Sequence, residues 1–365
     1  LLYKMNIDII AGARPNFMKI APIIHAIQKK QKENININFR LIHTGQHFDQ
    51  NMSGSFFDQL QIPEPNINLG AGGGTQAEQT ASIMIGYEKL LMKESSDLCL
   101  VVGDVTSTMA CSIVAKKMNV KVAHVEAGIR SFDLTMPEEI NRMVTDSITD
   151  YFFTTSETAN KNLSMAGVNN ENIFFVGNTM IDTLLKQIPN FQKPPFYEEF
   201  ELIQGNYFVL TLHRPGNVDE KEKLKSFISE IVLNSNNLPI IFPVHPRTAK
   251  ILKEVGIEFL NLKYVEPLGY LEFNYLVKNA KAVITDSGGI TEETTVMNIP
   301  CLTLRDNTER PETVTIGTNE LVGTNPKSIA LYLQKLLEGK WKKGNIPEKW
   351  DGKTADRIID ILLNI

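Results

Sequence analysis

The chain contains 365 residues, which is more than one ordinary hydrophobic core supports, so its length favours two domains. Its hydrophobic content of 42% and charged content of 22% are those of a globular protein, and the sequence contains neither a membrane-spanning apolar run nor a cleavable signal, so we expect a cytoplasmic protein without a membrane partner. The net charge of −5 excludes a broad attraction to nucleic acid, and any phosphate-bearing ligand must be bound by local groups.

The first half of the chain alternates short β-branched segments with longer segments of helical periodicity, which is typical of βαβ units and a parallel sheet. The predicted strands are residues 6–11, 37–43, 98–102, 120–125, 151–154 and 173–176, and the predicted helices are residues 17–30, 75–91, 109–118 and 138–149. These elements predict one doubly wound domain over residues 1–188.

The same alternation restarts after a polar, proline-rich stretch at residues 189–198, which we expect to be the linker region. The predicted strands are then residues 207–211, 239–242, 263–265, 282–285 and 300–303, and the predicted helices are 220–233, 271–280 and 326–337. We therefore predict an α/β fold with two Rossmann-like doubly wound domains facing across a cleft, the second over residues 189–350. Residues 351–365 carry an apolar helical stripe over 354–363 and are expected to pack back on the first domain.

Loops that follow strands are the first places to search for function, because ligands of open α/β sheets bind beyond the carboxyl ends of the strands. After the first strand, Gly12 begins a turn that places two cations, Arg14 and Lys19, at the start of a helix, where anions are attracted; an ordinary capped helix start is the alternative. Segment 70–75 resembles a dinucleotide fingerprint only superficially, because no clear strand precedes it, and a simple turn is favoured.

Three acidic loops are expected to converge on one rim of the first sheet. Asp104 follows a buried strand, Glu126 follows the next strand, and Glu138 and Glu139 open a helix. Asp104 would alternatively be only an N-cap, and one of the two glutamates at the helix start would alternatively be structural. Clustered carboxylates repel one another unless chemistry or a cationic ligand uses them, so the pattern favours a catalytic site.

The second half supplies cations and free backbone amides at its strand ends. Two His/Arg pairs follow consecutive strands, at residues 213–214 and 245–247, and a repeated pair of this kind favours a binding site over a structural role. Segment 286–293 combines glycines with a helix start, which forms a phosphate cradle in which Glu293 could accept both ribose hydroxyls. Segment 305–312 adds two more cations, and together these loops predict a nucleoside-diphosphate site.

Seven segments occur in the order and approximate spacing of the non-hydrolysing UDP-N-acetylglucosamine 2-epimerases, and the chain resembles this family over essentially its whole length. The segments are 12–15, 103–108, 124–130, 137–142, 211–217, 286–293 and 308–313. The resemblance implies a GT-B-like fold whose C-terminal domain holds most of the nucleotide. It implies that Asp104, Glu126 and Glu138 are catalytic, with His213 beside the diphosphate. The implied substrate-binding residues are Arg14, Lys19, Arg142, His245, Ser287, Gly288, Glu293, Arg305 and Arg310.

The reaction that the resemblance implies is inversion of C2, which interconverts UDP-GlcNAc and UDP-ManNAc for cell-surface polysaccharide synthesis in a homodimeric enzyme. The C2 proton is hardly acidic, because C2 is not next to a carbonyl, so the anomeric C1–O bond must break first. A carboxylate then removes the C2 proton to give 2-acetamidoglucal, and UDP adds back. No step needs NAD or a metal, so no cofactor is predicted, and the three cysteines, Cys99, Cys111 and Cys301, are interpreted as small buried hydrophobes.

Departures from the family pattern leave the exact sugar open. Asn16 stands where the family has an acidic residue, and segments 72–79 and 131–136 are more similar to relatives that act on UDP-2,3-diacetamido sugars and their uronates. A 2-epimerase of such a sugar and a hydrolysing epimerase are therefore alternatives, ahead of a GT-B glycosyltransferase or a catalytically silent UDP-sugar sensor.

Two further expectations concern individual residues. Some relatives are activated by a second UDP-GlcNAc; the pair Gln46–His47 of that site is present, but Gly73 and Gly74 stand where its Arg-Gln pair would be, so activation is expected to be weak or absent. Glu139 is expected to face a different side of its helix from Glu138, so the substitution Glu139→Gln is expected to be mild.

Overall fold

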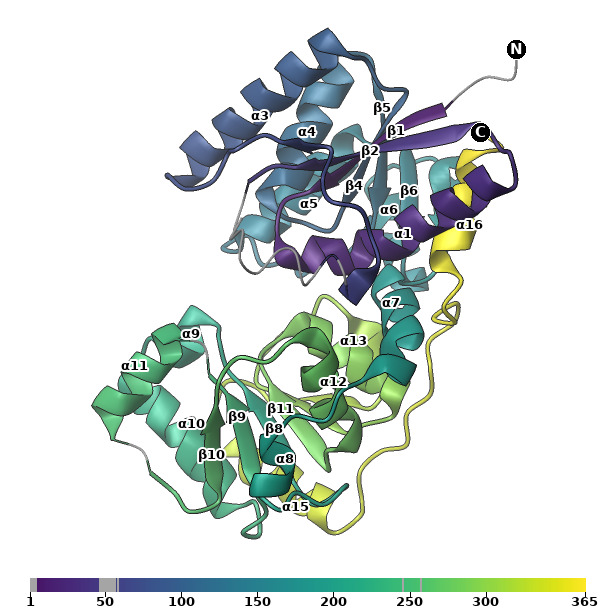
Figure 1. Cartoon of the computed structure of the whole chain (residues 1–365). Coiled ribbons are helices and arrows are strands. Elements are labelled where there is room, and N and C mark those ends of the chain that lie inside the picture. Colours follow the sequence, from purple (N-terminus) through teal and green to yellow (C-terminus); the bar gives the residue numbers. More distant parts are fainter. Residues whose placement is uncertain (1–4, 46–56, 58, 245, 257) are drawn as a thin grey trace. The chain divides into compact units, whose positions relative to one another are not determined.

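The computed structural model describes the chain except for residues 1–4, 46–56, 58, 245 and 257 (Figure 1). The polypeptide divides into two compact units: the first consists of residues 1–185 and 348–365, and the second of residues 186–347. The sequence predicts the divisions after residues 188 and 350, whereas the structure has each of them a few residues earlier. One reason is that the tail is anchored in the first unit already before Asp351.

The first unit is built on a seven-stranded parallel sheet with the strand order β3-β2-β1-β4-β5-β6-β7. Its strands are β1 (Met5–Ala11), β2 (Ile37–His43), β3 (Ile67–Asn68), β4 (Leu98–Val102), β5 (Lys121–Val125), β6 (Tyr151–Thr154) and β7 (Ile173–Phe175). Its helices are α1 (Arg14–Lys32), α3 (Gln76–Lys93), α4 (Thr106–Lys117), α5 (Pro137–Ile148), α6 (Glu157–Met165), α7 (Thr179–Gln187) and α16 (Thr354–Leu362), with a 3-10 turn at Asn170–Asn172. The last two residues of α7 belong to the second unit.

Apolar, β-branched sequence explains the central strands of this sheet, and all five residues of β4 are buried. A cluster that includes Ile10, Tyr87 and Val101 fills the space between the sheet and the helices α3 and α4. The elements β3, α6 and α7 are not among those predicted from the sequence. The strand β3 has only two residues, and α6 is rich in polar residues; it begins where the Ser156 hydroxyl accepts a hydrogen bond from the backbone N–H of Ala159.

The second unit contains a six-stranded parallel sheet with the order β10-β9-β8-β11-β12-β13. Its strands are β8 (Phe208–Thr211), β9 (Ile240–Pro243), β10 (Leu262–Val265), β11 (Ala282–Thr285), β12 (Cys301–Thr303) and β13 (Asn319–Leu321). Its helices are α8 (Phe196–Glu199), α9 (Pro215–Val218), α10 (Lys221–Leu233), α11 (Pro246–Val255), α12 (Tyr270–Asn279), α13 (Gly288–Met297), α14 (Pro311–Thr315) and α15 (Ser328–Leu337), with a 3-10 turn at Ile188–Asn190.

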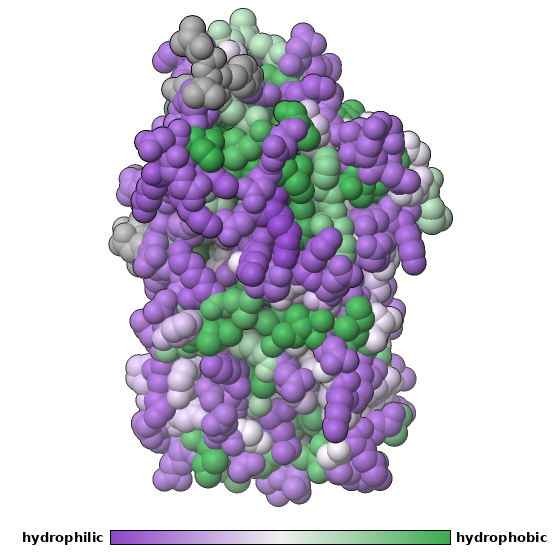
Figure 2. All heavy atoms as spheres, turned by 90° about the vertical axis from the view of Figure 1, so that its right-hand side faces the viewer, coloured by the Kyte–Doolittle hydropathy of each residue, from purple (hydrophilic) through white to green (hydrophobic). Residues whose placement is uncertain are grey.

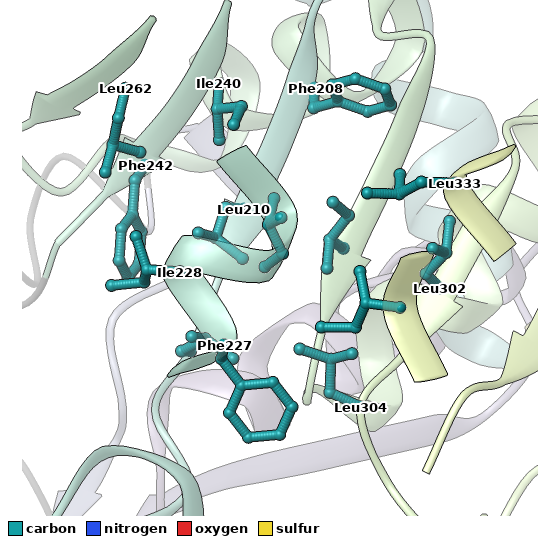
Figure 3. Packing of buried hydrophobic residues seen from close by; sticks show 14 of the residues in the cluster. Phe208, Leu210, Phe227, Ile228, Ile240, Phe242, Leu262, Leu302, Leu304 and Leu333 are labelled. Carbon is teal, nitrogen blue, oxygen red and sulfur yellow. The ribbon is translucent and has the colours of Figure 1, made fainter. Parts of the chain in front are cut away.

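Aromatic and aliphatic side chains from strands and helices form the core of the second unit. Phe208 and Phe242 from the sheet lie in one cluster with Phe227 of α10 and Leu333 of α15 (Figure 3). The strand β13 is not predicted from the sequence. It has only three residues and begins with Asn319 and Glu320, which are not typical of strands.

The C-terminal segment from residue 348 belongs to the first unit. Trp350 is buried, and its indole N–H donates to the carbonyl of Thr155 over 3.0 Å. Asp182 of α7 accepts hydrogen bonds from the first backbone N–H groups of α16, at Thr354 and Ala355. The helix α16 lies along α1 (Figure 1), where Lys30 forms an ion pair with Asp360.

The surface and the interior follow the usual division of polarity. Hydrophilic side chains cover much of the face in Figure 2, and hydrophobic residues gather there in smaller groups. In the part of the chain that the structure describes, no helix is both long and apolar enough to cross a membrane. Cys99, Cys111 and Cys301 are buried free cysteines, in agreement with their interpretation as small hydrophobes.

Each sheet reverses its direction of growth at one point, and these points position the functional loops. In the first unit β1 and β4 are neighbours, and the connections that follow them run in opposite directions along the sheet. In the second unit β8 and β11 have the same relation. Such a switch point is where open α/β sheets bind their ligands.

Candidate active site

Asn16 fixes the switch point of the first unit. Its side-chain oxygen accepts hydrogen bonds from the backbone N–H groups of Gly12 (3.1 Å) and Ala13 (2.9 Å), and its amide group donates to the carbonyl of Val102 over 3.2 Å. A carboxylate could accept the first two bonds but could not donate the third. The residue that departs from the family pattern therefore ties the loop after β1 to the end of β4.

Glu126 and Lys19 form an ion pair beside this loop. The Lys19 ammonium lies 2.7 Å from the Glu126 carboxylate, whose side chain is buried. Glu126 has a φ of +71°, in the left-handed region that non-glycine residues rarely adopt. The carbonyl of Phe153 holds this turn by accepting the backbone N–H groups of both Glu126 and Ala127. The structure thus places a predicted phosphate contact, Lys19, against a predicted catalytic carboxylate.

Gly103 brings the Asp104 loop against this ion pair. It has a φ of +69°, and a Cβ atom there would lie 3.2 Å from the Lys19 ammonium and 3.8 Å from a Glu126 carboxylate oxygen. A side chain at this position would be strained by that φ and would crowd the Lys19 ammonium, whereas glycine fits. The loops after β1, β4 and β5 therefore meet at one sheet edge, as the order of the strands predicts.

Asp104 is held by α5 and does not cap α4. Arg142 donates to Asp104 Oδ2 from Nε (3.0 Å) and Nη2 (2.5 Å), and Asn141 donates to the Asp104 carbonyl. The N-cap residue of α4 is Val105. The Asp104 side chain keeps 30% of its surface exposed, so it remains available to a ligand, whereas Arg142 is buried.

Glu138 and Glu139 differ sharply in environment. Glu138 is partly exposed, but Glu139 is buried and lies 2.7 Å from Arg142 Nη1. Glu139 also accepts the backbone N–H groups of Ser131 and Phe132. Burial alone would raise the pKa of Glu139, but these hydrogen bonds and the Arg142 guanidinium lower it overall. These contacts argue against the expectation that Glu139→Gln is mild, because Glu139 anchors both Arg142 and the loop before α5.

In the second unit, Asp286 orients His213 at the switch point. Asp286 is fully buried and lies 2.7 Å from His213 Nδ1, and it accepts the backbone N–H of Arg214 and the Asn217 amide. Burial would raise the pKa of Asp286, but the His213 ring and these donors lower it overall. His213 itself keeps 58% of its side-chain surface exposed, as a residue that contacts a ligand requires.

The start of α13 forms the predicted phosphate cradle. Ser287 is its N-cap residue and makes no side-chain capping bond, and Gly288 and Gly289 form its first turn. The first N–H groups of a helix have no partners within the helix, so they attract an anion. A Cβ atom at Gly289 would meet no atom within 4 Å, so the space beside this residue is open within the described residues.

Arg305 and Arg310 are buried in ion pairs of the second unit. The Arg305 guanidinium binds Glu309 through two bonds of 2.8 Å each, and Arg310 is hydrogen-bonded to Glu292. These pairings are close to Gly288, since a Cβ atom there would lie 3.7 Å from Arg305 Nη1. Both arginines therefore shape the loop beside the α13 start.

Glu293 is a buried residue of α13. Tyr270 donates to its carboxyl group over 2.8 Å, and the Asn274 amide lies 3.5 Å from the same oxygen. Burial raises the pKa of Glu293 to about 7, and the neighbouring Glu292 charge adds to the shift. A carboxyl group of this kind changes charge near neutral pH.

Some predicted residues cannot be placed. The Arg14 side chain and all of His245 lie outside the described part of the chain, as do Gln46 and His47. The residues 73–74 form a turn with positive φ that leads to Thr75, the N-cap of α3, which forms a capping box with Glu78. Among the residues that the structure describes, no group of three or more His, Cys, Asp or Glu side chains could hold a metal ion.

Comparison with known proteins decides the family. A family model described as UDP-N-acetylglucosamine 2-epimerase matches residues 29–363. The chain belongs to the UDP-N-acetylglucosamine 2-epimerase family. Its members are isomerases, and the two parallel-sheet α/β units described above are the GT-B-like fold of this family.

Two relatives illustrate the family. The chain is 44% identical to the UDP-N-acetylglucosamine 2-epimerase of Methanocaldococcus jannaschii over 98% of this chain and 99% of that one. It is similar to a crystal structure of that enzyme in complex with UDP-GlcNAc and UDP, with a TM-score of 0.87, 43% identity and coverage of 99% and 100% of the two chains. It is also 38% identical to the UDP-2,3-diacetamido-2,3-dideoxy-D-glucuronate 2-epimerase of Pseudomonas aeruginosa, over 99% of this chain and 100% of that one.

Proposed function

We propose that this enzyme interconverts UDP-GlcNAc and UDP-ManNAc by inverting C2 without hydrolysis. The observation that carries the proposal is the pair of fixed carboxylates in the first unit: Asp104 beside Arg142, and Glu126 beside Lys19. A reaction that removes a proton from one face of a sugar ring and returns it to the other face needs acid–base groups on both sides. Glu138, in the first turn of α5, is the third group of this set.

The reaction begins with cleavage of the C1–O bond to UDP. The ring then develops oxocarbenium character, and a carboxylate removes the C2 proton, so that neutral 2-acetamidoglucal and UDP lie side by side. Protonation of C2 from the opposite face and addition of UDP to C1 give the epimer. The proton that one carboxylate takes up is balanced by the proton that another gives, and no electron is transferred.

We assign the nucleotide to the second unit. His213, oriented by Asp286, lies beside the diphosphate and stabilises the charge of the departing UDP. The amides at Ser287 and Gly288 bind phosphate oxygens at the α13 start, and Glu293 accepts the ribose hydroxyls.

The cationic residues of the predicted set support this assignment in different ways. Arg305 and Arg310 hold the loop beside the α13 start in shape through their carboxylate partners, and a phosphate would add to the same network. Arg14 and His245 are assigned to substrate binding through the family resemblance alone.

The second candidate substrate is a UDP-2,3-diacetamido uronate. The Pseudomonas aeruginosa relative is named for this sugar, and the loop 131–136 is similar to such relatives. Glu139 holds this loop, which exposes the side chains of Phe132 and Leu134 next to α5. Comparison of kcat/KM for the two sugar nucleotides under identical conditions identifies the better substrate, and a preference for the uronate would replace UDP-GlcNAc in the proposal.

We also propose that the enzyme works as a cytoplasmic homodimer through the helices α3 to α5. The helix α4 contacts both α3 and α5, and these neighbours expose Ile85 and Met92 on α3 and Ile140 and Met143 on α5. Exposed apolar side chains grouped on one helix layer are typical of subunit contacts. Sedimentation is expected to give a dimer mass, which Ile85→Lys combined with Met143→Lys should reduce to the monomer; a monomeric unmodified protein would contradict the proposal.

Turnover in D2O tests the reaction. Purified enzyme and UDP-GlcNAc, followed through the anomeric NMR signals, are expected to give both epimers with deuterium at C2 and traces of UDP and 2-acetamidoglucal. Glu126→Gln should slow turnover by about 10²–10⁴-fold, whereas Glu157→Gln, on the exposed start of α6, should not. Release of free N-acetylmannosamine would indicate a hydrolysing enzyme, and full retention of the C2 hydrogen would exclude elimination.

A further inference from the structure

A buried carboxylate on α5 connects the two loops that carry Asp104 and Glu126. Asp146 Oδ1 lies 2.7 Å from Nδ1 of His124, and Asp146 Oδ2 accepts the backbone N–H of Gly128 over 3.1 Å. His124 Nε2 lies 2.8 Å from the carbonyl oxygen of Gly103. Gly103 precedes Asp104, and Gly128 follows Glu126 by two residues, so one carboxylate reaches both loops.

Both ring nitrogens of His124 face hydrogen-bond acceptors. Both of its neighbours, a carboxylate oxygen and a carbonyl oxygen, accept hydrogen bonds and donate none. A neutral imidazole has a single N–H, so only the imidazolium can make both bonds. His124 is completely buried, and its ring lies between Asp146 and Gly103.

Arg130 completes the cluster and keeps Asp146 ionised. Its Nη1 atom lies 2.7 Å from Asp146 Oδ2. Burial alone would raise the pKa of Asp146, but His124 and Arg130 together lower it. The carboxylate therefore keeps its charge in a site with almost no contact with solvent, where hydrogen bonds to charged groups are strong.

We infer that Asp146 and His124 are positioning residues for epimerisation, which set the Asp104 loop and the Glu126 loop at a fixed separation. This inference rests on the proposed roles of Asp104 and Glu126. The backbone between these loops has little freedom of its own, because Gly103, Glu126 and Gly128 all have positive φ. A chain of hydrogen bonds through the imidazolium is a rigid spacer, and small displacements of catalytic groups reduce rates steeply.

The first test separates positioning from general stability. Asp146→Asn and His124→Gln should each reduce kcat about 10²-fold while KM for UDP-GlcNAc stays within about threefold. The matched control is Asp182→Asn, which removes another buried carboxylate of the first unit but lies outside both loops and should keep kcat. If Asp146→Asn lowers the melting temperature as much as Asp182→Asn does and leaves kcat intact, the residue has only a structural role and the inference is wrong.

A double-mutant cycle with Asp104→Asn makes the inference separable from the proposed function. Asp146→Asn should cost less in kcat when Asp104 is already Asn, because one of the two groups that Asp146 positions is gone. Fully additive losses would overturn the positioning role. Full activity of Asp104→Asn alone would instead show that the proposed function has the wrong catalytic group.

The state of His124 can be observed directly, even in variants that turn over slowly. In the ¹⁵N spectrum of the unmodified enzyme at neutral pH, both ring nitrogens of His124 should have the shifts of protonated imidazolium, with the assignment made by their loss in His124→Gln. The signals should change in Asp146→Asn. A ring with one protonated nitrogen in the unmodified enzyme would overturn the proposed hydrogen-bond chain.

Discussion

Glu126 combines a catalytic assignment with an unfavourable backbone conformation. A φ of +71° costs a non-glycine residue about 1 kcal/mol or more. The two hydrogen bonds to Phe153 and the ion pair with Lys19 hold the residue there. Strain of this kind persists at functional sites because the side chain is needed where the backbone would prefer glycine.

The strain leads to a prediction for two substitutions at this position. Glu126→Gly and Glu126→Ala both remove the carboxylate and should both abolish turnover. The glycine variant should nevertheless be more stable than the alanine variant by about 1 kcal/mol, because glycine has no Cβ penalty at positive φ. Thermal and urea denaturation of the two variants measure this difference, and an alanine variant at least as stable as the glycine variant would show that the turn is unstrained.

Glu293 predicts a pH dependence of nucleotide binding. Its folded pKa of about 7 exceeds the ordinary value of 4.5, so ionisation of this group makes the folded protein without ligand less stable as the pH rises through 7. Ribose hydroxyls donate to the carboxylate form, so binding should release a proton, and the affinity for UDP-GlcNAc should rise between about pH 6 and pH 8.

Calorimetry in buffers of different ionisation enthalpy measures that proton. Glu293→Gln is the control, because it removes this carboxyl group and leaves every other side chain of the site in place. The variant should bind more weakly and lose the proton release. If it releases as many protons as the unmodified enzyme, Glu293 is not the titrating group.

The grouping of acidic residues at the candidate site can be predicted from the sequence, but their partners cannot. Asp104 and Glu126 follow buried strands, and parallel strands end at a common edge, which is enough to group them. The sequence gives no sign that Arg142 binds Asp104 or that Arg305 binds Glu309 in place of a free phosphate contact. Such pairs form where burial removes water from a charged side chain. Tertiary packing decides which side chains these are.

At the scale of elements, α5 supplies several of the side chains that hold the candidate site in place. It carries Glu138 at its start, Asn141 and Arg142 against Asp104, and Asp146 beneath both catalytic loops. One face of the helix therefore holds the site together, while Ile140 and Met143 remain exposed on another face.

The neighbouring glutamates of α5 should respond oppositely to the same substitution. Glu138→Gln should reduce kcat by about 10²–10⁴-fold with little effect on stability. Glu139→Gln should destabilise the protein by about 1–3 kcal/mol, because it weakens a buried, charge-assisted network, and it should lower activity through the displaced Arg142. Kinetics and denaturation of both variants check this pattern, and equal stability of the two would mean that the Glu139 contacts matter little.

Prediction of the elements fails where local sequence carries little information. The long strands and amphipathic helices follow from periodicity, whereas β3 and β13 have two and three residues and exist because a neighbouring strand offers free backbone groups. The helix α6 lacks a strong apolar stripe and depends on its N-cap and on contacts with β6 and β7.

At the scale of the whole molecule, the expected absence of substrate activation stays a prediction. Gly73 and Gly74 supply no guanidinium, so a second UDP-GlcNAc should bind at least about tenfold more weakly than with charge-assisted hydrogen bonds. Forward kinetics should be hyperbolic, and UDP-ManNAc should turn over without added UDP-GlcNAc. A reverse reaction that starts only after UDP-GlcNAc is added would reveal a working effector site.

The return of residues 348–365 to the first unit has a consequence for the order of folding during synthesis. The second unit is continuous in sequence, so all of its strands are synthesised before Trp350 and α16. The first unit begins earlier but must wait for these pieces, with the hydrophobic site of Trp350 open and Asp182 without the helix start that it caps. The chain of the unit assigned to the nucleotide is therefore made in full before the last pieces of the unit to which we assign the proton transfers.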